Sequence, residues 1–154
     1  MKKSGISGGM MRLPLLIALT FGLAAGGHAQ TAPQGVWVMM CEMVDESGTG
    51  WVPEFLMFTR QTGGPNAGRI EVYDAILHDL VGHPIQAVVT ADSAAGRSYG
   101  WALGRVTNRA GQLAERLDFR LHVSRSDGSA TLEVTPQGYL NVLRGQGRCI
   151  ALEK

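Results

Sequence analysis

The sequence predicts an all-β protein of about eight short antiparallel strands, either closed or nearly closed into a small barrel or arranged as a two-sheet sandwich. Three observations predict this class. Apolar and polar residues alternate through most of residues 36–149, turn-forming Gly, Pro, Asn and Asp separate the alternating segments, and the chain's two cysteines stand near the ends of this region. Short alternating segments with frequent turn signals are typical of antiparallel sandwiches and barrels.

Residues 1–29 have the three-part layout of a secretory signal peptide. A basic start that ends at Arg12 is followed by an apolar run, 13–25, and then by small residues, 27–29, that resemble a cleavage site. The apolar run is shorter than the roughly 20 residues that a transmembrane helix needs. We therefore expect export, most simply into a bacterial periplasm, of one domain formed by residues 30–154, with no membrane span.

The charge of the expected mature chain argues against a general nucleic-acid binder. Three of the 14 basic residues fall in the predicted signal, which leaves 11 against 13 acidic residues and a net charge of −2. A nucleic-acid-binding domain usually has a strongly basic balance or a basic patch. The length that remains, about 125 residues, is enough for a single domain with its own core.

The individual strands follow from the alternating segments. The clearest is 117–124, in which Leu117, Phe119 and Leu121 alternate with charged or polar residues. The other segments, in chain order, are 36–43, 54–60, 69–73, 85–91, 99–104, 130–134 and 139–143, with a continuation of the last toward Cys149.

One segment lacks this alternation. Apolar residues crowd together within 74–81, and Gly82 and Pro84 follow directly. Such a cluster, ended by glycine and proline, predicts a short helical turn near residues 74–81.

The two cysteines, Cys41 and Cys149, predict one structural disulfide. An even number of cysteines in an exported domain is typical of paired cysteines, and only one pairing within the chain is possible. In an up-and-down barrel the first and last strands are neighbours, so cysteines on those strands can approach closely. A sandwich whose terminal strands are adjacent would allow the same bond.

The start of the first strand carries a short family resemblance. Gly35-Val36-Trp37 resembles the G-x-W that opens lipocalins and related calyx-shaped barrels. The resemblance implies an eight-stranded barrel with a ligand cavity, and it makes Arg144 or Arg148 the late basic residue that packs on the tryptophan. The chain is shorter than typical lipocalins and closer in size to avidin-like barrels. Both families serve as architectural analogies, because fold alone does not give function.

The segment 99–104 supplies the candidate ligand site. Tyr99, Trp101 and Arg105 are expected on one face of a strand whose other face carries glycine and alanine. Aromatic walls with a few polar groups are typical of small-ligand cavities, although such a face is also typical of an ordinary core. Tyr139 and Asn141, on the expected last strand, are candidates for the same cavity.

Charge is distributed unevenly between the two halves of the mature chain. Residues 30–92 contain eight acidic and two basic residues, whereas 93–154 contain nine basic and five acidic residues. Arginine recognises carboxylate and phosphate groups through a planar fork of donors. This asymmetry is compatible with an anionic partner such as an envelope glycan, a lipid headgroup or an acidic protein face. Solvated strand faces, combined with a preference for arginine codons, are the explanation that we favour.

Two clusters carry metal-ligand atoms, but neither has the geometry of a site. Helical spacing pairs Asp74 with His78 and Asp79 with His83, and points the two histidines in different directions. The sulfur atoms near the first strand, in Met39, Met40, Cys41, Met43 and Met57, are spread over both faces of strands. We therefore expect no metal and no cofactor.

These observations favour an exported, non-catalytic binding protein of the cell envelope that recognises a small or anionic ligand. The alternative is a protein–protein interaction module, such as an inhibitor of an envelope enzyme, that uses an exposed loop at 45–51 or 74–83. A hydrolase is the third possibility, although no nucleophile elbow or phosphate-binding loop is present in the sequence.

Overall fold

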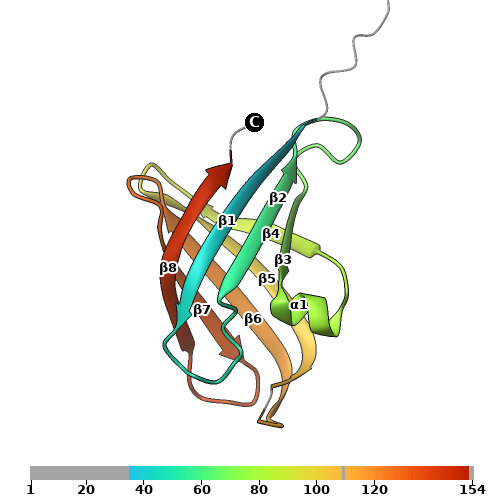
Figure 1. Ribbon diagram of the computed structural model, residues 1–154, viewed down its shortest axis with the longest axis vertical. Helices are drawn as coiled ribbons and strands as arrows, with labels where there is room; N and C mark the ends of the chain where they lie inside the picture. Colours follow the sequence, from blue (N-terminus) through green and yellow to red (C-terminus); the bar gives the residue numbers. More distant parts are fainter. Residues whose placement is uncertain (1–34, 109, 153–154) are drawn as a thin grey trace, which may run out of the picture. The chain divides into compact units, whose positions relative to one another are not determined.

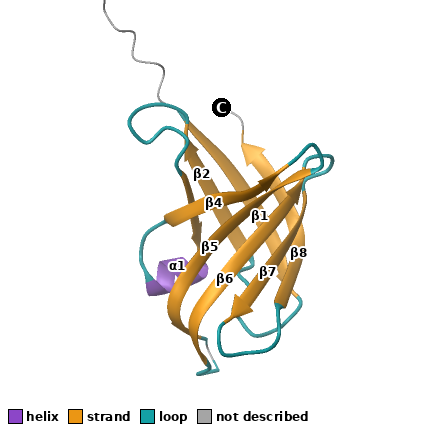
Figure 2. Ribbon diagram, turned by 180° about the vertical axis from the view of Figure 1, so that it is seen from behind, coloured by secondary structure: helices purple, strands orange, loops and turns teal. Residues whose placement is uncertain are grey.

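The computed structural model describes residues 35–108 and 110–152, and the predicted signal peptide lies outside them. The described residues form eight strands and one short helix (Figures 1 and 2). The strands are β1 (Val36–Asp45), β2 (Phe55–Gln61), β3 (Ile70–Asp74), β4 (Ile85–Asp92), β5 (Gly96–Thr107), β6 (Leu113–Ser124), β7 (Ser129–Pro136) and β8 (Leu143–Leu152). Helix α1 (Ala75–Leu80) lies between β3 and β4, and no helix of the described part is long and apolar enough to cross a membrane.

The strands close into one antiparallel barrel in chain order, with β8 paired to β1. The predicted all-β class is confirmed, and the barrel is formed rather than the sandwich. Because every neighbouring pair is antiparallel, successive connections lie at alternate ends of the barrel (Figure 1). The end that we call the turn end has the connections 62–69, 93–95 and 125–128. The opposite end, which we call the loop end, has the connections 46–54, 75–84, 108–112 and 137–142.

The apolar side chains of the alternating segments point inward and fill the barrel. Those that are 0 % exposed include Leu56, Phe58, Val72, Leu117, Leu121, Leu132 and Val134. An aromatic cluster occupies the interior: the ring of Phe58 lies 5.0 Å from that of Tyr99 and 5.5 Å from that of Trp101. Trp101 also stacks on Phe119 at 5.1 Å. Each large apolar side chain buried in this way contributes about 1.5–3 kcal/mol to folding.

The predicted disulfide is confirmed. Cys41 and Cys149 are direct register partners on β1 and β8, with an S–S distance of 2.01 Å and a Cα–Cα distance of 4.0 Å. The bond therefore joins the first strand to the last at the pairing that closes the barrel.

The predicted helical turn is also confirmed, with Asp74 as its N-cap. The Asp74 carboxylate accepts a hydrogen bond from the Leu77 N–H at 2.9 Å, which satisfies one of the free donors of the first helical turn. Burial raises the pKa of Asp74, and the N–H groups of Leu77 and Ile76 oppose this shift. The helix ends at Leu80, so His83 is not on it and the expected helical Asp79–His83 pair is wrong.

The predicted last strand is wrong over 139–142, whereas its predicted continuation toward Cys149 is a strand. β8 begins at Leu143, which pairs with Val134, and residues 137–142 form a loop. Gly138 has a φ of 95°, a left-handed conformation that turns the chain away from β7 before the pairing begins. Alternation over five residues did not distinguish this loop from a strand.

The packing that the lipocalin resemblance implied for Trp37 is also different. The guanidinium of Arg60, the register partner of Trp37 on β2, lies 5.5 Å from the centre of the indole ring. Arg144 instead pairs with Glu133, and Arg148 is the register partner of Ser129. The basic residue on Trp37 therefore comes from the second strand, because register and not chain order decides which side chains meet.

Candidate functional site

The structure places the two aromatic residues of the predicted ligand face in the packed core. Tyr99 is 3 % and Trp101 is 6 % exposed, and both contact the ring of Phe58. Their surroundings at this level of the barrel include Leu121 and Leu132, which have no exposed surface. Their observed contacts are those of core residues.

The other three predicted residues lie elsewhere. Arg105 is exposed and does not share the inward face of Trp101, because its φ of 46° interrupts the alternation and the next buried residue is Val106. Tyr139 and Asn141 lie in the loop 137–142, where the Tyr139 hydroxyl donates to the backbone carbonyl of Leu113 at 3.2 Å. The predicted site is thus divided between the core and the loop end.

A groove of about 590 Å³ lies on the outer face of β4 to β7. Its floor is β5, whose outward residues here are Gly100 and Ala102. A Cβ added at Gly100 would lie 2.9 Å from the methyl group of Thr90, so a larger residue would crowd the β4 side of the groove. The polar and charged lining residues come from β4, β6 and β7: Gln86, Thr90, Arg116, Asp118, Arg120, Glu133 and Thr135.

The charged groups of this groove differ in whether they are already paired. Asp118 accepts a hydrogen bond from Arg116 at 2.7 Å, and Glu133 accepts one from Arg144 at 3.2 Å. Among the described residues no carboxylate lies within 4.0 Å of the guanidinium of Arg120. Arg120 faces the floor from β6, where its register partner on β5 is Gly100.

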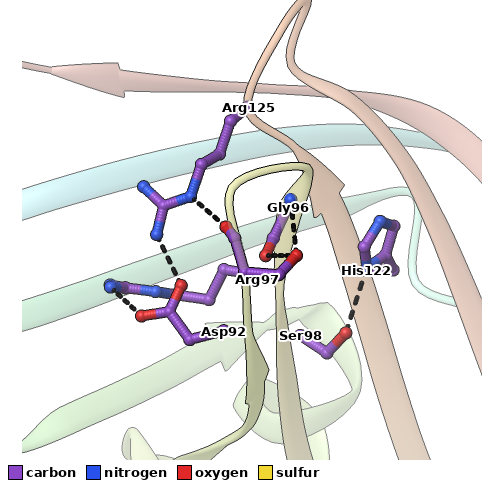
Figure 3. Close-up of polar contacts among 7 residues, drawn as sticks. Asp92, Gly96, Arg97, Ser98, His122 and Arg125 are labelled. Carbon is purple, nitrogen blue, oxygen red and sulfur yellow. Dashed lines mark hydrogen bonds and ion pairs between the residues drawn. The ribbon is translucent and has the colours of Figure 1, made fainter.

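A second group of polar residues surrounds the β4–β5 turn (Figure 3). The Asp92 carboxylate binds Arg97 at 2.6 Å and also binds Arg125 from the β6–β7 turn. Arg125 donates further to the backbone carbonyl of Ser93 at 2.9 Å. Hydrogen bonds from the two guanidinium groups lower the pKa of Asp92 to about 2. This network ties two neighbouring turns together.

Beside this network, Ser98 and His122 form a hydrogen-bonded pair on the outer face (Figure 3). The Ser98 Oγ lies 3.0 Å from the His122 Nδ1, and the imidazole lies against Gly96, where a Cβ would come within 2.7 Å of the ring. A serine and a histidine at this distance are two parts of a hydrolytic triad. In the described residues no carboxylate is hydrogen-bonded to the imidazole, so the pair lacks the third group that would orient the histidine.

The candidate metal ligands do not gather. Met39 and Met43 are buried in the core, whereas the His78 imidazole faces the Asp79 carboxylate at the surface. Within residues 35–108 and 110–152, no group of three or more His, Cys, Asp or Glu side chains could hold a metal ion.

Of the two loops offered for a protein partner, 45–51 buries its tryptophan, whereas 74–83 is mostly exposed from His78 onward. Trp51 is 2 % exposed, and its ring meets that of Tyr139 edge to face at 5.4 Å. The apolar residue at the tip of the neighbouring loop is instead Leu140, which is fully exposed.

Comparison with known proteins assigns no family: no family model matches the chain, and no curated protein or solved structure is significantly similar to it. The sites described above are therefore the basis for a functional argument.

Sequence reasoning did not single out Arg120, although the sequence contained a signal for it. The alternation predicts a strand at 117–124, and Asn108 and Gly111 are turn-forming residues between it and the segment 99–104. In the structure the connection is 108–112, and the register about it places Arg120 opposite Gly100, whereas a connection of 108–111 would place Arg120 opposite Tyr99. The informative pattern is a strand with charged outward residues that lies beside a strand whose outward residues are small.

Proposed function

We propose that this protein is an exported, non-catalytic binding protein of the bacterial cell envelope that holds an extended anionic ligand in the groove over β4 to β7. The predicted signal peptide supports export, since its layout is that of a secreted chain. An acidic glycan is the ligand class that best matches the groove, because the lining combines guanidinium, amide, hydroxyl and carboxylate groups.

The observation that carries this proposal is that the guanidinium of Arg120 has no carboxylate partner among the described residues. Both groove carboxylates have an arginine partner, whereas Arg120 has none among the described residues. Its fork of donors is therefore available for a carboxylate or phosphate of a ligand, and such charge-assisted bonds are about twice as strong as neutral ones.

The shape of the groove supports an extended ligand. It crosses four adjacent strands, which spans about 14 Å at a spacing of about 4.8 Å between neighbours. The floor residues Gly100 and Ala102 leave this path open along the middle of the sheet. A short chain of sugar rings can lie across it with its acidic groups toward β6.

Calorimetry with the mature domain tests the proposal. Hexagalacturonic acid, which carries a carboxylate on each ring, is expected to bind, and neutral maltohexaose is expected to bind much more weakly. Arg120→Gln should weaken binding about tenfold, because a charge-assisted hydrogen bond is lost. Raising the salt concentration should weaken the wild type more than the variant.

Arg105→Gln is the matched control. Arg105 is an exposed arginine on the same sheet that faces Glu115 at 3.8 Å and does not line the groove. Equal binding of both hexasaccharides, or equal losses in the two arginine variants, would overturn the proposal.

A second candidate function, docking of a partner protein, is favoured by one observation at the loop end. Leu140 is fully exposed at the tip of the loop 137–142, and Leu113, Tyr139 and Val142 beside it are each more than a third exposed. Apolar side chains clustered on a surface often mark a protein interface. Chemical crosslinking in periplasmic extract tests it: a specific crosslinked product should form with the wild type and be absent with Leu140→Ser.

A further inference from the structure

The outer surface of the barrel over β8, β1 and β2 is mainly apolar. These three strands lie side by side on the near side of the barrel in Figure 1. Along β1 and β2 the outward positions alternate with buried residues, and Ile150 and Leu152 hold outward positions of β8. Eight large apolar side chains at these positions, each exposed or half-buried, form a surface that we call the β1 face: Val36, Val38, Met40, Val44, Phe55, Met57, Ile150 and Leu152.

The β1 face differs from an ordinary solvated strand face. Val44 is 69 %, Ile150 is 57 % and Val36 is 50 % exposed. On β6, by contrast, the outward positions 118, 120, 122 and 124 hold aspartate, arginine, histidine and serine. Exposed apolar side chains that gather in this way often mark a surface that contacts another molecule.

Strand register makes the side chains of the β1 face neighbours. Ile150 is paired with Met40, and Met40 is paired on its other side with Met57. In the next outward row, Leu152 is paired with Val38. Because directly paired residues on one face lie about 5 Å apart, the apolar side chains form one continuous surface across the strands.

One pair of opposite charges lies in the row beside Ile150 and Met40. Arg148 on β8 and Glu42 on β1 are register partners, and both are exposed. Within the described part of the chain, neither of them forms an ion pair within 4.0 Å. A positive and a negative group that lie side by side are complementary to the same two groups of a copy turned by 180°.

We propose that two copies of this protein form a symmetric dimer through the β1 face. The two-fold axis runs along the strands, midway between β8 and β1, so that each residue of β8 faces its own register partner in the second copy. Arg148 then faces Glu42 of the second copy, and Ile150 faces its Met40. The groove over β4 to β7 lies on other strands, so this inference does not depend on the proposed function.

The charges distinguish this axis from its neighbours on the same face. An axis on β1 itself would place Glu42 opposite Glu42 of the second copy, and the like charges would repel each other. An axis between β1 and β2 would place Glu42 opposite Phe55, its register partner on β2, and would leave it without a positive counterpart. Of the three, the axis between β8 and β1 matches opposite charges and apolar side chains together.

Sedimentation velocity of the mature domain tests whether the dimer forms. The contact is limited to the outer residues of three strands on a convex barrel, so it is smaller than the roughly 800 Å² per partner of a standard interface. We therefore expect a weak dimer with a Kd of about 10–100 µM, seen as a sedimentation coefficient that rises between about 2 and 500 µM protein. A monomer throughout this range would overturn the proposal.

Charge reversal tests whether Arg148 meets Glu42 of the other copy. Glu42→Arg alone and Arg148→Glu alone each place like charges at both contacts, and each should weaken the dimer about tenfold or more. An equal mixture of the two variants restores both attractive contacts, so it should dimerise at concentrations where neither variant does alone. This recovery arises between chains and not within one, and it also shows that both variants are folded. A mixture that stays monomeric would contradict the proposed contact.

Matched variants show whether the loss is specific to the β1 face. Met40→Thr together with Ile150→Thr should weaken the dimer about tenfold, because apolar contact is lost. Glu115→Arg reverses an exposed carboxylate on β6 and should leave the Kd unchanged. Leu113→Thr, at an exposed apolar residue of the loop end, should also leave it unchanged. Equal losses in these two controls would place the contact on another surface and overturn the proposal.

Discussion

The two ends of the barrel are built from different interactions. At the turn end, the carboxylate of Asp92 is bound by Arg97 and Arg125, and these charged side chains connect the 93–95 and 125–128 turns. At the loop end, the ring of Trp51 packs against that of Tyr139, and side chains bind backbone groups within the 46–54 loop.

The two ends therefore differ in which side chains are bound by others and which are exposed. At the turn end the Asp92 carboxylate is shared by two guanidinium groups, so these charged groups already bind one another. The loop end fixes its backbone internally and exposes apolar side chains, including Leu80 and Leu140. Binding at the loop end is therefore expected to depend on apolar contact, whereas the stability of the turn end is expected to depend on pH and salt.

The largest predicted effect concerns the disulfide, because it acts on both ends at once. Replacing Cys41 and Cys149 together by Ala removes a crosslink between residues 108 apart in sequence, which constrains the unfolded chain. The free energy of unfolding should fall by about 4 kcal/mol. Urea denaturation measures it, and hydrogen exchange should show faster opening at the turn end and the loop end alike.

Reduced wild-type protein is the control for the double variant, and the two should unfold at similar urea concentrations. A loss below about 1 kcal/mol would contradict the role assigned to the crosslink. Faster exchange at one end alone would show that the two ends open independently.

The strands could be predicted from the sequence because each one shows the alternation of apolar and polar residues within its own segment. Alternation identified residues 117–124 and 130–134, and the two cysteines indicated that the first and last strands meet. The confirmed Cys41–Cys149 bond lies at the β1–β8 pairing that closes the barrel, although a sandwich with adjacent terminal strands would also allow it. Hydrophobic period and the cysteine positions predicted the all-β class and about eight strands, but they left the choice between barrel and sandwich open.

The candidate sites were harder to predict from the sequence, because they depend on the backbone conformation of single residues and on strand register. The left-handed conformation at Arg105 moves that side chain off the face of Trp101, and the turn at Gly138 takes Tyr139 out of the last strand. Arginine does not predict a left-handed conformation in an alternating segment, and Gly138, which favours one, precedes the segment predicted as the last strand. The groove around Arg120 depends on the pairing of four strands, which single-segment patterns do not give.

The second prediction concerns the loop end alone. Asp45→Ala removes the acceptor for the backbone N–H groups of the 46–54 loop and for the Ser47 hydroxyl at 2.6 Å. The free energy of unfolding should fall by about 1–2 kcal/mol, since four hydrogen bonds are lost, two of them partly buried. Exchange of amides in the loop should accelerate while amides of the 93–95 turn keep their wild-type rates.

Asp45→Asn is the control, because its amide oxygen can still accept from Ser47 and Gly48, and it should lose less stability than the alanine variant. If the turn end also loosened in Asp45→Ala, the contrast between the two ends would not hold.

The smallest predicted effect concerns the turn end and its pH dependence. The folded-state pKa of Asp92 is lowered to about 2 from an ordinary value of 3.8, because Arg97 and Arg125 bind the ionised form. Between these values the unfolded chain binds more protons than the folded one, so this contribution is complete above pH 4 and is lost as the pH falls toward 2. Asp92→Asn lacks it, and the variant should be less stable than the wild type at pH 6 but equally stable near pH 2.

Thermal unfolding at pH 6, 4, 3 and 2 measures this difference, and added salt at pH 6 should reduce it because the carboxylate is exposed. Asp127→Asn provides a comparison at the same end of the barrel. Its pKa is also lowered to about 2, but mainly by hydrogen bonds from Ser129, so its effect should respond less to salt. A gap between wild type and Asp92→Asn that is constant from pH 6 to pH 2 would mean that Asp92 acts through packing, and the electrostatic account of the turn end would be wrong.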